Sequence, residues 1–220
     1  MLVSNMDRPT HTRIRRPRKD SQLKAAAILK AAKELFLRDG YSDTSMDAVA
    51  LEAGVSKRTV YGHFGNKEDL FAEIIREMCS DVLPSDVARK DEDSHNVEEH
   101  LTRIGTDFLA AIYGEEQIRL FRTIVSDSRI YPEIGRMMYE GPVMASNRVV
   151  HAYLEKMVKK GVLALSDTEL AAAQFLGMLK TDIHLRLLFN HRLVLSGSDI
   201  ETLARKCARL FLNGALAPQR

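Results

Sequence analysis

Apolar residues recur every three or four positions through most of this chain, which is the spacing of one face of an α-helix. The first such stretch lies between Ser21 and Gly40, and its apolar face consists of Ile28, Ala31, Ala32, Leu35 and Phe36. Gly40 follows this face directly, where a glycine commonly ends a helix. No stretch of useful length alternates as a strand does, and no internal repeat is present, so the pattern predicts an all-α protein.

Two short helices are predicted between residues 44 and 64. Thr44 and Asp47, three residues apart, resemble a capping box for the first helix, and Ser56 can cap the second. Gly54 lies between the helices and supplies a tight turn. Two helices joined by a turn of about four residues predict a helix-turn-helix.

The rest of the chain is predicted to be helical to its end. Asn66 can cap a fourth helix, and helices are expected again after the polar stretch ARKDEDSHN. The sequence Gly141-Pro142 interrupts one of them. The last two helices are expected to follow Ser166 and Ser198, each of which begins an S-x-x-E capping box.

The expected fold is therefore all-α, with about nine helices in two domains. The first residues contain many basic and few apolar side chains, and such a segment cannot fold alone. Pro84 and the polar stretch after it mark a boundary. The predicted segments are a disordered basic arm at 1–19, a helix-turn-helix domain at 20–66, a connecting helix at 67–81, a boundary loop at 82–95, and a helical effector-binding and dimerisation domain at 96–220.

Composition narrows the class of protein. Apolar residues make up 45% of the chain, which is enough for a core, but none of their runs approaches the ~20 residues that span a bilayer. Cys79 and Cys207 match no metal-binding spacing, so they are expected to be buried thiols, with a redox-sensing thiol as the alternative. We therefore expect a cytoplasmic protein without a metal, a cofactor or a membrane partner.

Charge is distributed unevenly along the chain. Residues 1–67 carry 13 Lys and Arg against 7 Asp and Glu, whereas residues 68–220 carry 19 against 23. A basic first third followed by a mildly acidic remainder indicates a polyanionic partner at one end only.

Double-stranded DNA is the polyanion that a helix-turn-helix binds, with the N-terminal residues of its second helix in the major groove. The base-reading candidates are Lys57, Arg58, Thr59 and Val60, and the phosphate-binding candidates are Thr44, Tyr61, His63 and Lys67. Tyr61 has packing against the first helix as its alternative role, and His63 an ordinary surface position. Arg13, Arg15, Arg16 and Arg18 are candidates for an arm in the minor groove, the alternative being a solubilising arm.

Several of these residues belong to a longer pattern. Phe36, Gly40, Tyr41, Thr44 and Ser45 are followed by AVALEAGVS, TVYGHF and KEDL. This pattern resembles the DNA-binding domain of the TetR family, the tetracycline-repressor-like bacterial transcriptional regulators. A weaker match, FRTIVSDSRIYPEIGRMMYEGP, is similar to the effector domain of the AefR-like subgroup. The resemblance implies a palindromic operator bound by a dimer, with repression as the default. Lys57-Arg58 departs from the pattern, because many members have a variable residue and a glycine there.

The second domain is larger than DNA binding requires, and two roles are predicted for it. One is dimerisation through its last two helices, by Leu179, Ile183, Leu187, Leu203, Cys207 and Leu210. The other is a pocket for a small apolar effector, because methionine-rich surfaces adapt to varied ligands. Its candidate lining is Phe108, Ile112, Phe121, Arg122, Met137, Met144, Asn147, His151, Gln174 and Met178, although most of these residues could equally be ordinary core.

An enzyme and a DNA-binding protein with a structural second domain are the two alternative functions. A di-iron enzyme needs paired E-x-x-H motifs in a helical bundle, and the chain has none; it also has no recognisable nucleophile motif, so we expect no enzymatic activity. A DNA-binding protein with a purely structural second domain cannot be separated from a ligand-responsive one by sequence.

Overall fold

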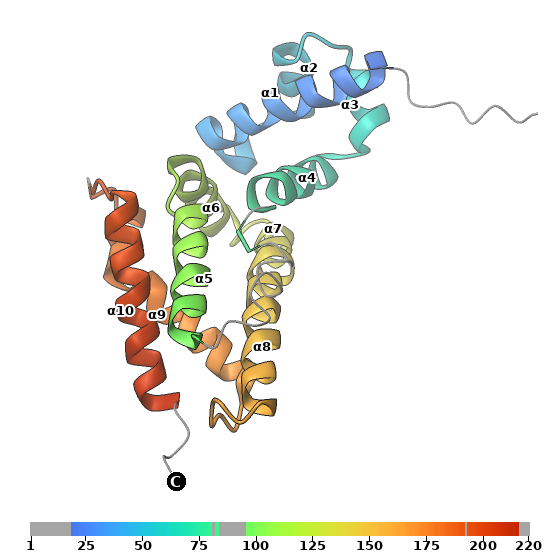
Figure 1. Ribbon diagram of the computed structural model, residues 1–220. Helices are drawn as coiled ribbons and strands as arrows, with labels where there is room; N and C mark the ends of the chain where they lie inside the picture. The colour runs from blue at the N-terminus through green and yellow to red at the C-terminus, as the bar shows by residue number, and fades with distance from the viewer. Residues whose placement is uncertain (1–18, 81, 84–95, 192, 216–220) are drawn as a thin grey trace, which may run out of the picture.

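The structure is a computed structural model, which describes residues 19–80, 82–83, 96–191 and 193–215 (Figure 1). These residues form ten α-helices and one π-helical turn and contain no strand, which confirms the all-α prediction. The elements are α1 (Lys19–Asp43), α2 (Met46–Glu52), α3 (Lys57–Phe64), α4 (Lys67–Cys79), α5 (Val97–Ile112), α6 (Glu115–Asp127), α7 (Pro132–Met138), η1 (Tyr139–Val143), α8 (Met144–Lys159), α9 (Thr168–Leu188) and α10 (Gly197–Ala215).

The N-terminal helices turn where the sequence predicts. Gly40 has a φ of 87° near the end of α1, and Gly54 has a φ of 63° between α2 and α3, a region that side chains disfavour. Ser56 caps α3, since its Oγ accepts a hydrogen bond from the Thr59 amide at 3.2 Å. Asn66 likewise caps α4. Helices α2 and α3 therefore form the predicted helix-turn-helix.

Three other predicted caps are displaced by one or two residues. Ser45, Asp167 and Ser196 take the cap positions in place of Thr44, Ser166 and Ser198. Thr44 cannot cap α2 because its hydroxyl is buried and donates to the Gly40 carbonyl at 2.8 Å. At α10 the true box pairs Ser196 with Asp199, each of which accepts a hydrogen bond from the other's amide.

Two hydrophobic cores hold the chain together. The first joins α5, α8, α9 and α10, and the second joins α1–α4 to α6 and α7. Leu120, Ile124 and Ile134 therefore share a core with the helix-turn-helix. Cys79, at the end of α4, packs against both cores. In Figure 1, α1–α3 form one end of the molecule and α4 leads from them to the remaining helices.

The helices α5 and α10 pack closely against each other in the bundle. A Cβ added at Gly105 would lie 3.0 Å from the Ala204 Cβ of α10 and from Leu179 Cδ2 of α9, so any larger residue there would require these neighbours to shift. No described helix is both long enough and apolar enough to cross a membrane.

Two irregular turns lie in the middle of the bundle. Pro142, predicted to interrupt a helix, lies in η1, a π-helical turn that joins α7 to α8. Helix α9 kinks at Thr181, whose φ of 30° is unusual for a β-branched residue. The Tyr113 hydroxyl donates to the Lys180 carbonyl at 3.0 Å, and the Cys207 thiol to the Met178 carbonyl at 3.6 Å. Donors from outside α9 thus satisfy carbonyls next to the kink.

Candidate functional site

The N-terminal end of α3 presents two basic side chains to solvent. Lys57 and Arg58 are exposed on the first turn, directly after the Ser56 cap. Lys57 forms an ion pair with Asp47 of α2 at 2.7 Å, and this partner raises the pKa of Lys57. Arg58 has no hydrogen bond or ion pair to any described residue. Arg58 is therefore available to a ligand, whereas Lys57 is already paired with Asp47.

The other two base-reading candidates are less accessible. The Thr59 hydroxyl is half-buried and lies 2.8 Å from the Ser56 hydroxyl. Val60 is 0% exposed and belongs to the core beneath α3, so the prediction that it contacts bases is wrong. Val60 follows the exposed Arg58 by two residues on a short helix packed against α1 and α2, so its side chain lies on the opposite, inward face.

The four phosphate-binding candidates also differ in how exposed their side chains are. Tyr61 is 43% exposed, which places its hydroxyl within reach of a ligand, and His63 is half-buried beside Phe64. Thr44 is buried, and its hydroxyl is already used by the Gly40 carbonyl, so its side chain is not available to a phosphate here.

Lys67 is also turned towards the protein. Its Nζ lies 4.3 Å from the centre of the Tyr41 ring and donates to the Ser42 carbonyl at 3.3 Å. Burial lowers the pKa of Lys67. A phosphate contact by Lys67 therefore requires its side chain to leave the Tyr41 ring. The arm residues Arg13, Arg15, Arg16 and Arg18 lie outside the described residues.

A link between the two parts of the molecule was not predicted from sequence. The Asp127 carboxylate, at the end of α6, accepts hydrogen bonds from the amides of Tyr41 at 2.8 Å and Ser42 at 3.1 Å. A Cβ at Gly40 would meet this carboxylate at 3.4 Å. Lys33 of α1 also pairs with Glu116 of α6 at 2.6 Å. Helix α6 thus holds α1 at two points, directly before the helix-turn-helix.

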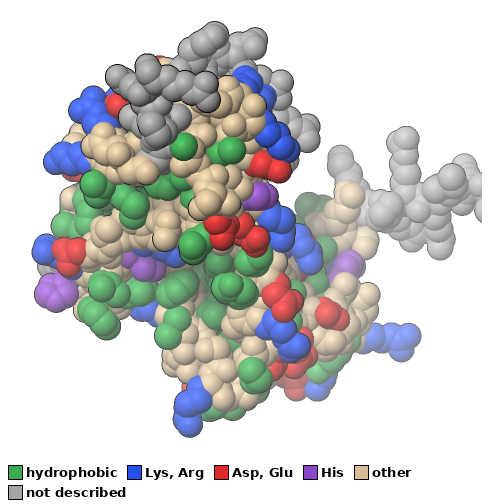
Figure 2. Space-filling view, turned by 90° about the horizontal axis from the view of Figure 1, so that it is seen from below, with side chains coloured by type: hydrophobic (Ala, Val, Ile, Leu, Met, Phe, Trp, Pro, Cys, Tyr) green, Lys and Arg blue, Asp and Glu red, His purple; other side chains and the backbone are tan. Residues whose placement is uncertain are grey.

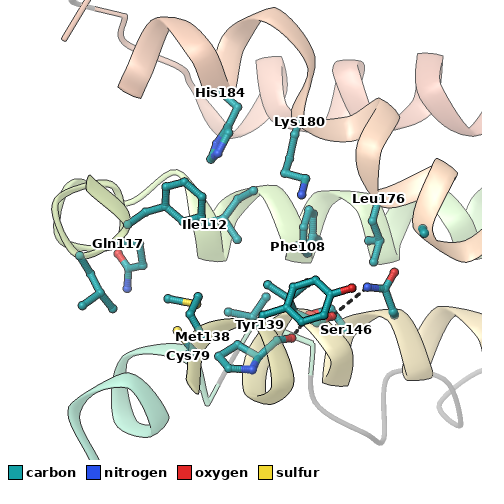
Figure 3. A pocket seen from close by; sticks show the side chains of 17 residues that line it. Cys79, Phe108, Ile112, Gln117, Met138, Tyr139, Ser146, Leu176, Lys180 and His184 are labelled. Carbon is teal, nitrogen blue, oxygen red and sulfur yellow. Dashed lines mark hydrogen bonds between the residues drawn. The ribbon is translucent and has the colours of Figure 1, made fainter. Parts of the chain in front are cut away.

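The C-terminal part contains a cavity of about 290 Å³ (Figure 3). Helices α4, α5, α6, α8 and α9 contribute to its wall, together with α7 and η1. The lining includes Phe108, Ile112, Leu120, Phe121, Met138, Leu176, and the polar Gln117, Ser146, Asn147, Lys180 and His184. A mostly apolar wall with a few polar groups is the usual composition of a small-molecule site.

Four of the ten predicted pocket residues line this cavity: Phe108, Ile112, Phe121 and Asn147. The other six do not, namely Arg122, Met137, Met144, His151, Gln174 and Met178. Arg122 instead donates to the carbonyls of Leu187 and Leu188 and so caps the C-terminal end of α9. His151 lies 3.1 Å from the Thr168 hydroxyl, and Gln174 is exposed. Lys180 and His184 were missed, although two polar residues four apart on an apolar helix were a visible signal.

Cys79 lies in the cavity wall, and the pKa of its thiol indicates how reactive it is. Burial raises the pKa of the Cys79 thiol to about 11, and burial also raises the pKa of Cys207. A thiol of raised pKa is a poor nucleophile at neutral pH, which argues against the redox-sensing alternative.

The candidate dimer residues occupy different environments. Leu179 and Cys207 are buried in the core of their own chain, so they are not free for an interface. Leu203, Ile183 and Leu187 are half-buried, whereas Leu210 is 66% exposed. Other exposed apolar side chains on or next to these helices are Leu170, Leu185, Phe189 and Val194. Seen from the end opposite the helix-turn-helix, basic and acidic side chains are interspersed among hydrophobic ones (Figure 2).

The fold and these surfaces define a DNA-binding transcriptional regulator with a helix-turn-helix domain and a helical C-terminal domain. Residues 28–74 match the model of the bacterial regulatory proteins of the tetR family, and residues 99–214 match the C-terminal domain of AefR-like transcriptional repressors. The chain therefore belongs to the TetR family and to its AefR-like subgroup.

Individual relatives agree with this assignment. The chain is 31% identical over 182 residues to the uncharacterized HTH-type transcriptional regulator YhgD of Bacillus subtilis, covering 80% of this chain and 88% of that one. A solved TetR-family regulator from Mesorhizobium loti superposes with a TM-score of 0.80 at 28% identity, covering 92% of this chain and all of that one. The flavonoid-responsive regulator FrrA superposes with a TM-score of 0.75 at 30% identity, covering 89% and 98%. These relatives are transcriptional regulators and not enzymes.

Proposed function

We propose that this protein is a ligand-responsive repressor acting in the cytoplasm, which binds a palindromic operator as a homodimer and releases it when a small, largely apolar effector fills the cavity. The observation that carries this proposal is the position of α6. One helix contributes Gln117 and Phe121 to the cavity and binds the end of α1 through Asp127.

DNA recognition is assigned to the exposed end of α3. Arg58 is the principal base-reading residue, because it is exposed and has no partner among the described residues. Arginine donates two hydrogen bonds to guanine in the major groove. Lys57 also contacts the operator once DNA displaces Asp47 from its ammonium group. Thr59 and Tyr61 contact the operator from the same helix. Lys67 supplies a phosphate contact if it leaves the Tyr41 ring.

Dimerisation is assigned to the exposed faces of α9 and α10. Leu170 and Leu185 on α9, and Leu210 on α10, are each more than half exposed. Exposed leucines on two helices that contact each other could be buried together at a two-fold interface. A two-fold dimer presents two copies of α3 to an operator with two equal half-sites.

Ligand response follows from the link through α6. A ligand that shifts α6 moves the Asp127 carboxylate. The backbone of Tyr41 and Ser42, which is hydrogen-bonded to this carboxylate and precedes α2, then moves with it. The two copies of α3 must lie about 34–36 Å apart to enter successive major grooves, so a change in their spacing releases DNA. The ligand acts by favouring the wrongly spaced state. FrrA, which superposes on this chain, is a flavonoid-responsive regulator, and this supports aromatic molecules as a first panel.

The test has two stages. Sequences bound by the purified protein are selected from random double-stranded DNA, and we expect a palindrome with half-sites about 10 base pairs apart. Operator binding is then measured by gel shift while apolar and aromatic compounds are added. Failure to shift any duplex at low salt would exclude the DNA-binding assignment. A protein that binds its operator but shows no response, in gel shift or thermal unfolding, to any member of a broad panel would be the constitutive alternative.

A further inference from the structure

One wall of the cavity, the donor wall, carries the Lys180 ammonium, which can donate hydrogen bonds to a ligand. Lys180 and His184, four residues apart on α9, both point into the cavity (Figure 3). No ion pair joins Lys180 to a carboxylate of the described residues, and no acidic group offsets the burial that lowers the pKa of Lys180. The Nδ1 atom of His184 is buried without a hydrogen-bond partner in the described part of the chain.

The facing wall offers acceptors instead. The Asn147 amide nitrogen donates to the Val143 carbonyl at 3.1 Å, so the orientation of this side chain is fixed. Its Oδ1 atom is buried and has no partner among the described residues. Ser146 donates its hydroxyl hydrogen to the Pro142 carbonyl at 3.0 Å, so only its lone pairs remain for a ligand. Between the two walls lie the side chains of Phe108 and Ile112 (Figure 3).

The donor wall is held rigidly. The kink at Thr181 directly follows Lys180, and the Tyr113 hydroxyl binds the Lys180 carbonyl at 3.0 Å. Backbone strain of this kind persists only where the surroundings fix it, and it is concentrated at ligand sites. The C-terminal end of α9 is bound by Arg122 of α6. A ligand held by Lys180 therefore contacts the helix that is tied to α6.

We propose that the effector is an apolar monoanion, whose anionic oxygen lies against the Lys180 ammonium and whose hydroxyl group, where present, donates to Asn147 Oδ1. This inference rests on the proposed function, because it names the chemical class of the effector. A half-buried cation without a counterion is unfavourable, and a bound anion supplies the missing charge. Carboxylates and acidic phenols share this chemistry. The cavity volume of about 290 Å³ is close to the lower end of known ligand sites, ~300 Å³.

The test is calorimetric titration of the full-length protein with matched probes. Octanoate and 3-phenylpropionate are each compared with the neutral primary amide of the same shape. Naringenin, a phenol, is compared with the same compound methylated at its most acidic hydroxyl. We expect an acidic probe to bind about 10- to 100-fold more tightly than its neutral partner, as expected for one charge-assisted hydrogen bond. Comparison of the carboxylate pairs with the phenol pair shows whether the cavity prefers a carboxylate or a phenolate as its anionic group.

Three variants assign the effect to Lys180. Lys180→Met keeps the length of the side chain without its charge, and we expect it to bind acid and amide equally. Lys180→Arg should retain the preference for the acid. Lys30→Met, which removes an exposed lysine of α1, is the matched control and should leave ligand binding unchanged. Thermal unfolding checks that each variant folds, and the comparison of acid with amide in the natural protein depends on no variant.

The outcomes separate this inference from the proposed function. Equal affinity for acids and their neutral partners, or no binding of any probe, would overturn the anionic effector; neutral compounds that release the operator would still support a ligand-responsive repressor. Acids that bind through Lys180 without weakening operator binding would support the anion site and contradict the proposed function.

Discussion

At the scale of single residues, the recognition helix is partly neutralised by its own protein. Lys57 is paired with Asp47 at 2.7 Å, whereas Arg58 next to it has no partner among the described residues. A phosphate or a base must displace Asp47 before it can use Lys57. Both side chains of the ion pair are largely exposed, and such pairs are weak enough to exchange readily.

Asp47→Asn is therefore expected to strengthen binding to any duplex. The substitution frees Lys57 and removes a negative charge near the DNA, so affinity should rise about two- to five-fold, in line with a weak surface ion pair. The slope of log affinity against log salt should steepen by about one, because one more phosphate is neutralised. Gel shifts over a salt series measure both quantities. Unchanged affinity and slope would mean that Lys57 does not contact DNA.

Arg58→Ala should instead change which sequences are preferred. Each lost base contact is expected to cost about 1–3 kcal/mol at the preferred site and less at mismatched sites. Tyr61→Phe removes only a hydroxyl, and should weaken binding to all duplexes alike. The measurement is competitive binding to a set of operator variants. If Arg58→Ala left the ranking of these variants intact, Arg58 would be a phosphate contact.

At the scale of elements, α6 and α4 both contact the cavity and the core of the helix-turn-helix. We propose α6 as the route of the ligand response. It contributes Phe121 to the cavity, caps α9 through Arg122 and binds the end of α1 through Asp127. Helix α4 packs against the same core, but α6 alone among the described elements places a carboxylate on the amides of Tyr41 and Ser42.

Asp127→Ala tests this connection. It leaves two backbone amides without their carboxylate, so the free energy of unfolding should fall by about 1–3 kcal/mol. Operator binding should also lose part of its response to an effector, because α6 then no longer binds the amides at the end of α1, and the Lys33–Glu116 pair is its remaining polar contact with α1 among the described residues. Urea unfolding and gel shifts with and without effector measure the two effects. Lys159→Ala is the control, since its exposed ion pair with Glu155 lies within α8 and should contribute at most about 1 kcal/mol. A full effector response in Asp127→Ala would exclude this route.

The same elements show what sequence could predict. Helical periodicity and glycine positions are local, so the helix-turn-helix and its turns at Gly40 and Gly54 were predictable. The exact caps were not, because neighbouring residues such as Thr44 and Ser45 both carry capping side chains and tertiary packing decides between them. The contact of Asp127 with Tyr41 joins residues 86 apart in sequence, and no local pattern encodes it.

At the scale of the whole molecule, the proposed dimer would determine how strongly DNA is bound. In such a dimer one α3 would read a single half-site, and the second copy would add its contacts without a second loss of translational freedom. The exposed leucines of α9 and α10 are the part of the described surface best suited to this interface, while the helix-turn-helix lies at the opposite end from the mixed charges of Figure 2.

Combining Leu185→Glu with Leu210→Glu should therefore separate the dimer. Both positions are more than half exposed in one chain, at 51% and 66%, so the change should leave the fold of that chain intact while placing charges in the interface. Light scattering after size exclusion should show a monomer, and operator affinity should fall by about 100-fold or more as one half-site is lost. Val162→Glu, at an exposed position between α8 and α9, is the matched control and should remain dimeric. A double variant that stays dimeric and keeps its operator affinity would show that the interface lies on another face. A natural protein that is monomeric and binds the operator with full affinity would exclude the dimer itself.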